Sequence, residues 1–279
     1  MFKTNKLGFL NIMPNIELLI LFAVIGVATG PMASTILISP ALLAVPILSF
    51  FLPVLGLSFD AWFLVCIATA IVAFLPTHLY AWIVGMKNKT VETQVLIRHT
   101  AGMGMGGVIG AQLLSLASVW AFTLAFSLIA LLAIVGVILD LLKKSKPILF
   151  HPYLGNMPSG LLIGTVSVVS GNGGGVLGHY FCHFKRLPVQ LQQSTVEGFV
   201  VFISIAAMVG FLYPASAFDN MALQGFAGVI YLPGAGALAI SHFFFYWLCR
   251  NRGNELDKKV LSMSFVIFLL ASLTRMWTT

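Results

Sequence analysis

Residues 170–175 read Ser170-Gly171-Asn172-Gly173-Gly174-Gly175, and this stretch lies inside an apolar run from Met157 to Phe184. Glycine costs about 1 kcal/mol against alanine in a helix interior, so the stretch predicts a break in a membrane helix. A bilayer tolerates the freed backbone groups only where protein or a water-filled cavity covers them. Half-helix ends at mid-membrane direct N–H groups inward, which suits an anion. We therefore interpret residues 170–175 as half of a substrate site.

The composition is that of a polytopic membrane protein. Of the 279 residues, 59% are hydrophobic and 8% are charged. No strand-like alternation of the kind found in membrane β-barrels is present. The net charge of +7 comes from basic residues in short loops beside apolar runs, as the positive-inside rule expects. We therefore predict a lipid bilayer, and not nucleic acid, as the partner of these charges. Cys66, Cys182 and Cys249 are isolated and indicate no disulfide framework.

The order of apolar runs predicts an all-α polytopic protein built from two repeats. The first repeat, 1–146, would hold a broken element over 16–57 and three spans, and the second, 147–279, a broken element over 157–184 and three more. The legs around the glycines are each about 20 Å long, against about 30 Å for a bilayer core, which favours a re-entrant hairpin. The predicted spans are 59–85, 100–116, 118–142, 188–213, 222–249 and 258–277.

The two halves resemble each other in the order of their elements. Gly30-Pro31-Met32-Ala33-Ser34-Thr35 takes the place in the first half that the glycine stretch takes in the second, and Thr69 parallels Thr195. We expect the first element to be broken around Gly26 and Gly30-Pro31 and again at Pro40, Pro46 and Pro53, with hydroxyl donors from Ser34 and Thr35 in the segment that matches the glycine stretch. If each broken element returns to the side it entered, the 15 Lys and Arg residues divide 12 to 3 between the two sides; eight simple crossings would give 9 to 6. The positive-inside rule prefers the first arrangement, which makes the halves inverted repeats with both termini outside the cytoplasm.

Polar residues inside the spans are candidates for the site. Glu197 lies about ten residues into its span, where a carboxylate is a functional hypothesis by default; the alternative is that its segment is an interfacial end. His78 and His242 are candidate proton carriers beside Glu197, although a packing histidine is the commoner outcome. The predicted substrate-binding residues are Gly30, Ser34, Thr35, Thr69, Ser170, Gly171, Asn172, Gly173, Gly174, Gly175, Gln193, Ser194 and Thr195.

Other chemistries find little support. No Gly-Lys-Ser/Thr follows the glycines, which excludes a nucleotide loop, and no nucleophile elbow or His-Glu-x-x-His is present, so no catalytic residue is expected. His179 and His183 are one helical turn apart without a third ligand, so we predict no metal and no other cofactor. The glycines could instead serve only close helix packing.

The pattern resembles the TauE/SafE sulfite-exporter family, also called the toluene-sulfonate uptake permease family. Gly171-Asn172-Gly173-Gly174-Gly175 fits the Gly-x-Gly-Gly-Gly-like motif of that family, and Ala68-Thr69 and Ser194-Thr195 are similar to its Thr-Ser-containing helix. The first half departs from the motif, and Tyr180 stands where the family usually has proline. The resemblance implies transport of a small organic or sulfur-containing anion, such as sulfite or a sulfonate, through a bacterial inner membrane.

We therefore expect a secondary transporter that binds a small anion between the two broken elements and rocks one repeat against the other. A non-transporting membrane enzyme or assembly factor is the alternative, and a channel is a third. The anion, the direction, the coupling ion and a homodimeric state are left open by the sequence.

Overall fold

The fold is described from a computed structural model, which covers residues 16–36, 38–142, 144, 149–150, 155–216, 225–252 and 257–278. The boundary between the predicted repeats, at 146–147, lies outside the described ranges, as do residues 1–15 at the start of the first predicted repeat.

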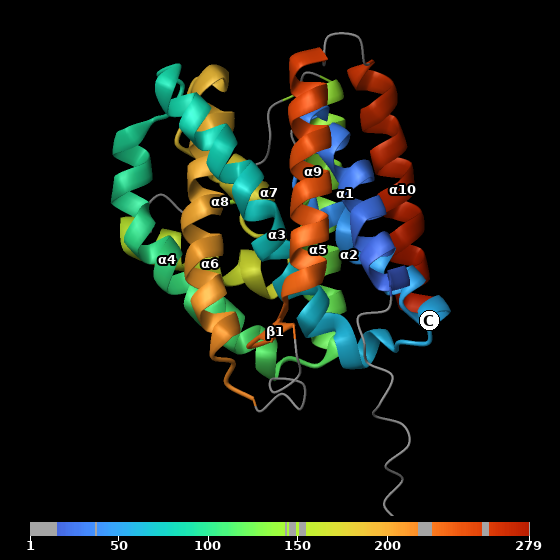
Figure 1. Ribbon diagram of the computed structural model, residues 1–279. Coiled ribbons are helices and arrows are strands. Elements are labelled where there is room, and N and C mark those ends of the chain that lie inside the picture. Colours follow the sequence, from blue (N-terminus) through green and yellow to red (C-terminus); the bar gives the residue numbers. More distant parts are fainter. Residues whose placement is uncertain are drawn as a thin grey trace, which may run out of the picture.

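The described chain is almost entirely helical (Figure 1), which confirms the predicted all-α class. A two-stranded antiparallel hairpin, β1 (Phe226–Ala227) and β2 (Ile230–Tyr231), is the exception within the described ranges. The helices are α1 (Ile16–Ile36), α2 (Ala41–Phe51), the 3-10 turn η1 (Pro53–Leu55), α3 (Phe59–Lys87), α4 (Thr93–Leu116), α5 (Val119–Leu141), α6 (Asn156–Val169), α7 (Gly175–Phe184), α8 (Val189–Leu212), α9 (Leu232–Arg252) and α10 (Lys258–Thr278).

Six helices in the described part of the chain are long and apolar enough to cross a bilayer, namely α1, α3, α5, α8, α9 and α10. About 20 apolar residues suffice for that crossing. Large apolar side chains point outward from them, as lipid contact requires; Ile240 on α9, for example, is 75% exposed. The chain is an integral, multi-pass membrane protein.

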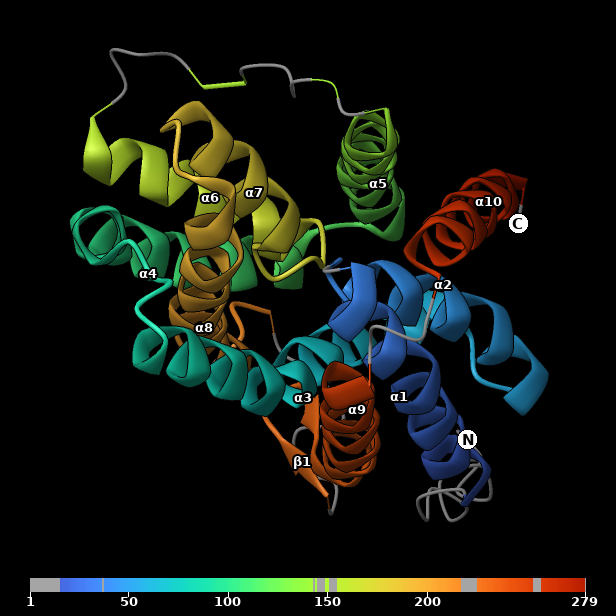
Figure 2. The ribbon, with the colours of Figure 1, turned by 90° about the horizontal axis from the view of Figure 1, so that it is seen from above.

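Seen from above, the helices form two groups with α3 between them (Figure 2). One group contains α4, α6, α7 and α8, and the other contains α1, α2, α9 and α10. Helix α3 packs against α8 on one side and against α9 on the other, so it joins the two groups.

Glycines set the closest helix crossings in both groups. A Cβ added to Gly110 on α4 would lie 2.8 Å from the carbonyl oxygen of Thr165 on α6, and one added to Gly30 on α1 would lie 2.8 Å from the carbonyl oxygen of His242 on α9. Contacts this short leave room only for glycine. The glycine-rich segment of α4 therefore allows close packing of helices.

The predicted break around Gly26 and Gly30-Pro31 is wrong. Helix α1 runs through Gly26, Gly30 and Pro31 to Ile36, and α2 runs through Pro46. The chain is non-helical at residues 38–40, so the break predicted at Pro40 is confirmed. Pro31 removes one N–H from the helix but keeps a helical φ, which membrane helices tolerate when neighbouring helices cover them. Ser34 remains within the helix, where its hydroxyl donates to the carbonyl of Pro31 at 2.9 Å.

The predicted break in the second half is confirmed. Helix α6 ends at Val169 and α7 begins at Gly175. The chain between them has φ values of 68° at Gly171, 69° at Gly173 and 115° at Gly174. These values lie in the left-handed region that glycine adopts without steric cost, so the glycines are what allows this turn.

The span predicted to start at residue 222 begins later, because α9 starts at Leu232. Gly225 and Gly228 adopt φ values of 92° and 59° and allow the β1–β2 hairpin before the helix. That the two halves are inverted repeats stays a prediction of the sequence.

Candidate functional site

The two helix breaks lie against each other. Ser39, in the break between α1 and α2, donates a hydrogen bond from Oγ to the carbonyl oxygen of Asn172 at 2.9 Å. On the other side, a Cβ added to Gly175 would lie 3.2 Å from Cβ of Ser39. The first-half residue that meets the glycine stretch is therefore Ser39, and not Ser34 as the sequence suggested.

This contact lies near the middle of the long helices. Ile71 and Phe74 of α3, together with Val200 and Ser204 of α8, line a small hollow beside Asn172. These four residues fall about halfway along their helices, which are both long enough to span a bilayer. The breaks therefore meet at about mid-membrane depth.

Two spaces of very different size adjoin the contact. The first is a cavity of about 470 Å³, and the second is the small hollow, of about 10 Å³, which has room for roughly one water molecule. Ser39 lines both spaces. The Ser39–Asn172 contact therefore stands between a roomy cavity and a nearly closed hollow.

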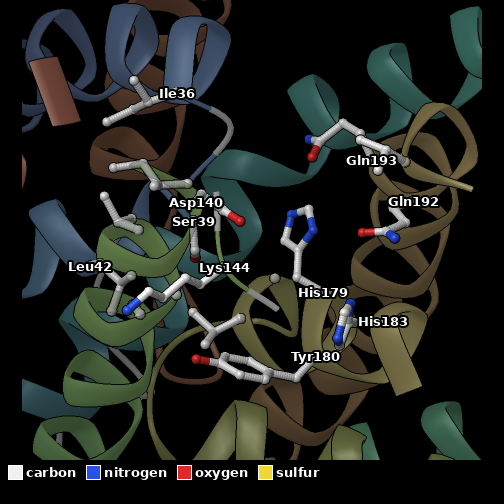
Figure 3. A pocket seen from close by; sticks show the side chains of 17 residues that line it. Ile36, Ser39, Leu42, Asp140, Lys144, His179, Tyr180, His183, Gln192 and Gln193 are labelled. Carbon is white, nitrogen blue, oxygen red and sulfur yellow. The ribbon is translucent and has the colours of Figure 1, made fainter. Parts of the chain in front are cut away.

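The cavity has polar side chains on facing walls (Figure 3). Asp140 lies in the last turn of α5, and Lys144 follows that helix. Opposite them lie His179 and His183 of α7, and Gln192 and Gln193 of α8.

The residues that line the cavity include the start of helix α7. Gly175 and Val176, the first residues of α7, line the cavity, and N–H groups in a first helical turn have no partner within the helix. Ala41, the first residue of α2, lines the hollow on the other side of the contact. Two helix N-termini thus converge on the breaks, and helix N-termini favour negative charge.

Asn172 has a buried side chain without a partner. Only 3% of the residue is exposed, and neither Nδ2 nor Oδ1 has a hydrogen-bond partner among the described residues. Leaving buried amide atoms unpaired costs about 1–3 kcal/mol. An unpaired donor and an unpaired acceptor therefore lie beside the hollow and near the first residues of α2 and α7.

An acid–base pair of a part-buried histidine and a buried glutamate lies next to the hollow. His78 lines the hollow, and its Nδ1 lies 2.5 Å from Oε2 of Glu197. The other carboxylate oxygen, Oε1, accepts a hydrogen bond from Nε2 of Gln193 at 2.6 Å. Glu197 is 8% exposed, which argues against the alternative that its segment is a wet interfacial end. Two of the three predicted proton carriers are therefore in contact.

The third, His242, has its hydrogen bond elsewhere and not to this pair. Its Nδ1 is 2.8 Å from the hydroxyl oxygen of Thr29, and its ring packs edge-on against Phe74 with 4.7 Å between ring centres. The residue is fully buried at the crossing of α1 and α9. This is the environment of a packing histidine, the alternative that the sequence left open.

Several predicted substrate-binding residues bond to neighbouring elements instead of lining either space. The hydroxyl of Thr69 accepts from the backbone N–H of Tyr231 at 3.0 Å, and that of Thr195 accepts from the N–H of Glu92 at 2.9 Å. Ser194 bonds to Thr90 at 2.8 Å. The predicted residues that line a space are His78, Asn172, Gly173, Gly175 and Gln193, whereas Gly30, Ser34, Thr35, Thr69, Ser170, Gly171, Gly174, Ser194 and Thr195 do not.

Sequence reasoning missed Ser39 and Ser204. The pair Ser39-Pro40 carries a recognisable turn signal, because proline disfavours helix at the residue before it. Ser204 is a single serine in an apolar span, and nothing in the sequence distinguishes it. Within the described ranges, no three His, Cys, Asp or Glu residues are grouped as metal ligands.

A multi-pass helical protein with helix breaks that meet at mid-depth beside a polar cavity has the architecture of a membrane transporter. A family model described as Sulfite exporter TauE/SafE matches residues 17–276. The chain therefore belongs to the TauE/SafE sulfite exporter family, whose members are transporters and not enzymes. No curated protein and no solved structure matches the chain.

Proposed function

We propose that this transporter carries a small organic or sulfur-containing anion, such as sulfite or a sulfonate, and binds it between the two helix breaks. The observation that carries the proposal is the buried, unpartnered amide of Asn172 beside the first residues of α2 and α7. An anion placed there would meet the Asn172 Nδ2–H, the Ser39 hydroxyl and the N–H groups at the start of α7. At the start of α2, the N–H groups of Leu42 and Leu43 already donate to the carbonyls of Ser39 and Pro40. The groups that would meet the anion are all donors, and none carries a charge that must be neutralised when the site is empty.

The contact between the breaks is closed in this structure. The hollow holds about one water molecule, and the Ser39 hydroxyl is engaged by the carbonyl of Asn172. An anion arriving through the cavity would therefore have to separate Ser39 from Asn172 and would take over the hydroxyl donor. The two halves would then act as inverted repeats that rock about the site and expose it to each side in turn. The membrane would be a bacterial inner membrane.

Flux through proteoliposomes tests the proposal. Purified protein would be reconstituted, and uptake and efflux of labelled sulfite and of labelled sulfonates would be measured. We expect transport by the unaltered protein and, for Asn172→Leu, a loss of about tenfold, which corresponds to about 1.4 kcal/mol of lost binding. Leucine keeps a similar volume while removing both polar atoms.

Two further variants serve as controls. Ser34→Ala removes a hydroxyl that bonds within α1, so its flux should match that of the unaltered protein. Gly174→Leu should abolish flux, because φ at this glycine is 115°. Wild-type flux in Asn172→Leu or in Gly174→Leu would remove the breaks from the mechanism. A folded, unaltered protein that moves none of the labelled anions would refute the proposed substrate class.

A further inference from the structure

Among the described residues, two sets of side chains reach from the cavity to the hollow, and one of them is the contact between the breaks. The second is a chain of three side chains, Gln193, Glu197 and His78. Gln193 lines the cavity and His78 lines the hollow, while Glu197 bonds to both of them. Its distances are 2.6 Å to Gln193 and 2.5 Å to His78.

We infer that these three side chains form a proton path that bypasses the Ser39–Asn172 contact. The His78–Glu197 pair would be the binding site of a coupling proton, and Gln193 would cover that pair on the cavity side. The inference rests on the proposed function, because it assigns a coupling ion to the same anion site. His242, the third histidine considered for this role, has no part in the path.

The members of the chain have different roles. An amide takes up no proton near neutral pH, so Gln193 is a positioning residue: its Nε2–H holds Oε1 of Glu197 and separates the carboxylate from the cavity. Carboxylate and imidazole both titrate, and an imidazole does so near neutrality. A proton would enter on Glu197 when Gln193 releases Oε1, and one proton would leave from His78 toward the hollow. One proton is bound and one is released, so the pair returns to its starting charge.

Other titratable groups face the pair from helix α9. Tyr246 interacts electrostatically with Glu197, and His242 interacts with His78. Arg250 donates from Nη1 to the hydroxyl of Tyr246 at 2.9 Å, and its guanidinium lies over the ring of Tyr80 at 5.8 Å. Among the described residues, however, the groups that hydrogen-bond to the Glu197 carboxylate are His78, at 2.5 Å, and Gln193, at 2.6 Å.

Charge explains why protons and anions would bind together. With one proton, the pair is neutral overall, as an imidazolium next to a carboxylate. With a second proton, the pair carries one positive charge beside the hollow, and this charge attracts an anion there. By linkage, the anion then raises the affinity of the pair for that proton by the same factor, which is about tenfold for a typical coupling.

The test uses a labelled sulfonate, because its charge does not change between about pH 5 and pH 8, the range in which imidazole titrates. Two rates are compared in proteoliposomes of the full chain: net uptake driven by an imposed pH gradient, and exchange of labelled against unlabelled sulfonate without a gradient. We expect the ratio of the two rates to fall toward zero in Glu197→Gln, because an amide at this position takes up no coupling proton.

A matched pair of glutamine variants isolates the role of Gln193. Gln193→Leu removes the hydrogen bond to Glu197 and should lower the same ratio of rates. It should also let protons enter in the absence of sulfonate, which a pH-sensitive dye in the lumen would measure. Gln192→Leu is the control, because Gln192 also lines the cavity but donates to the carbonyl of Leu187 and not to Glu197. The control should keep the unaltered ratio and show no proton leak.

The outcomes separate the two proposals. An unaltered protein without sulfonate exchange would refute the proposed function. Normal exchange together with an unchanged ratio in both Glu197→Gln and Gln193→Leu would overturn the proton path and leave the anion site standing. If Glu197→Gln yields no folded protein, the ratio and the leak in Gln193→Leu against Gln192→Leu decide the question.

Discussion

The two helix breaks that meet at mid-depth are made in different ways. The break between α6 and α7 depends on left-handed backbone at Gly171, Gly173 and Gly174. The break between α1 and α2 ends on Pro40, whose φ is −63°, and residues 38–40 have no positive φ. A turn that requires left-handed backbone is visible in the sequence as a run of glycines, whereas the other turn is marked by Pro40 alone.

The largest effect is expected at Gly30, where the sequence predicts a break but the structure has a close crossing of α1 and α9. In Gly30→Ala the new Cβ would lie 2.8 Å from two backbone atoms of α9, the carbonyl oxygen of His242 and the nitrogen of Tyr246. We expect the free energy of unfolding to fall by about 3 kcal/mol, since backbone cannot move aside cheaply. Thermal unfolding in detergent measures it.

Gly236→Ala on α9 is the control for that measurement. Nothing lies within 4 Å of the added Cβ, so this variant should gain up to about 1 kcal/mol from helix propensity. Equal stability of the Gly30 and Gly236 variants would contradict the packing role of Gly30.

Gly174 should give the next largest effect. Its φ of 115° is unfavourable for an L-residue, and an added Cβ would lie 2.8 Å from Cδ1 of Ile203. We expect Gly174→Ala to lose about 2 kcal/mol of stability and most of the sulfonate flux, because the turn that carries Asn172 is strained. Gly104→Ala, whose nearest neighbour would be Ala206 at 3.9 Å, should lose neither. A Gly174→Ala protein with normal flux would show that the left-handed turn is dispensable.

A smaller effect separates Ser39 from Ser34. Ser39→Ala removes a donor at the contact between the breaks, whereas Ser34→Ala removes a bond inside α1. We expect the apparent affinity for a labelled sulfonate to fall about fivefold in Ser39→Ala, equivalent to a net hydrogen bond of about 1 kcal/mol, and to stay constant in Ser34→Ala. A larger loss of affinity in Ser34→Ala than in Ser39→Ala would indicate that the substrate meets the first half at Gly30–Ser34 and not at Ser39.

The smallest effect is expected at Pro31. Because α1 is continuous here, Pro31→Ala should restore one helical hydrogen bond and raise the free energy of unfolding by about 0.5 kcal/mol, with little change in flux. Thermal unfolding and sulfonate uptake of the same preparation measure both quantities. A large loss of flux would indicate that the proline has a mechanical role in α1.

The sequence predicts those features that depend on local chemistry. Apolar length predicts the helices, and the glycines predict the second break with its buried Asn172. Rules for carboxylates and imidazoles in membranes single out Glu197 and His78 one at a time. Their contact is not predictable in this way, because it joins residues 119 positions apart through the packing of α3 against α8.

The errors also have physical causes. The sequence cannot distinguish a threonine whose hydroxyl binds a substrate from one whose hydroxyl accepts from a backbone N–H. Thr69 accepts from the backbone N–H of Tyr231. A Gly-Pro pair indicates a break equally well when, as at Gly30-Pro31, it serves close packing. Ser204 acquires its position beside the hollow only from the fold.

The β1–β2 hairpin ties two long helices together at its end of the molecule. The N–H of Val229 bonds to the carbonyl of Phe211 near the end of α8 at 3.0 Å, and the N–H of Tyr231 bonds to the hydroxyl of Thr69 on α3 at 3.0 Å. If α3 and α8 move apart there, at least one of these two amides loses its acceptor. Deuterium uptake at Val229 and Tyr231 would then report, amide by amide, how often that end of the protein opens during turnover.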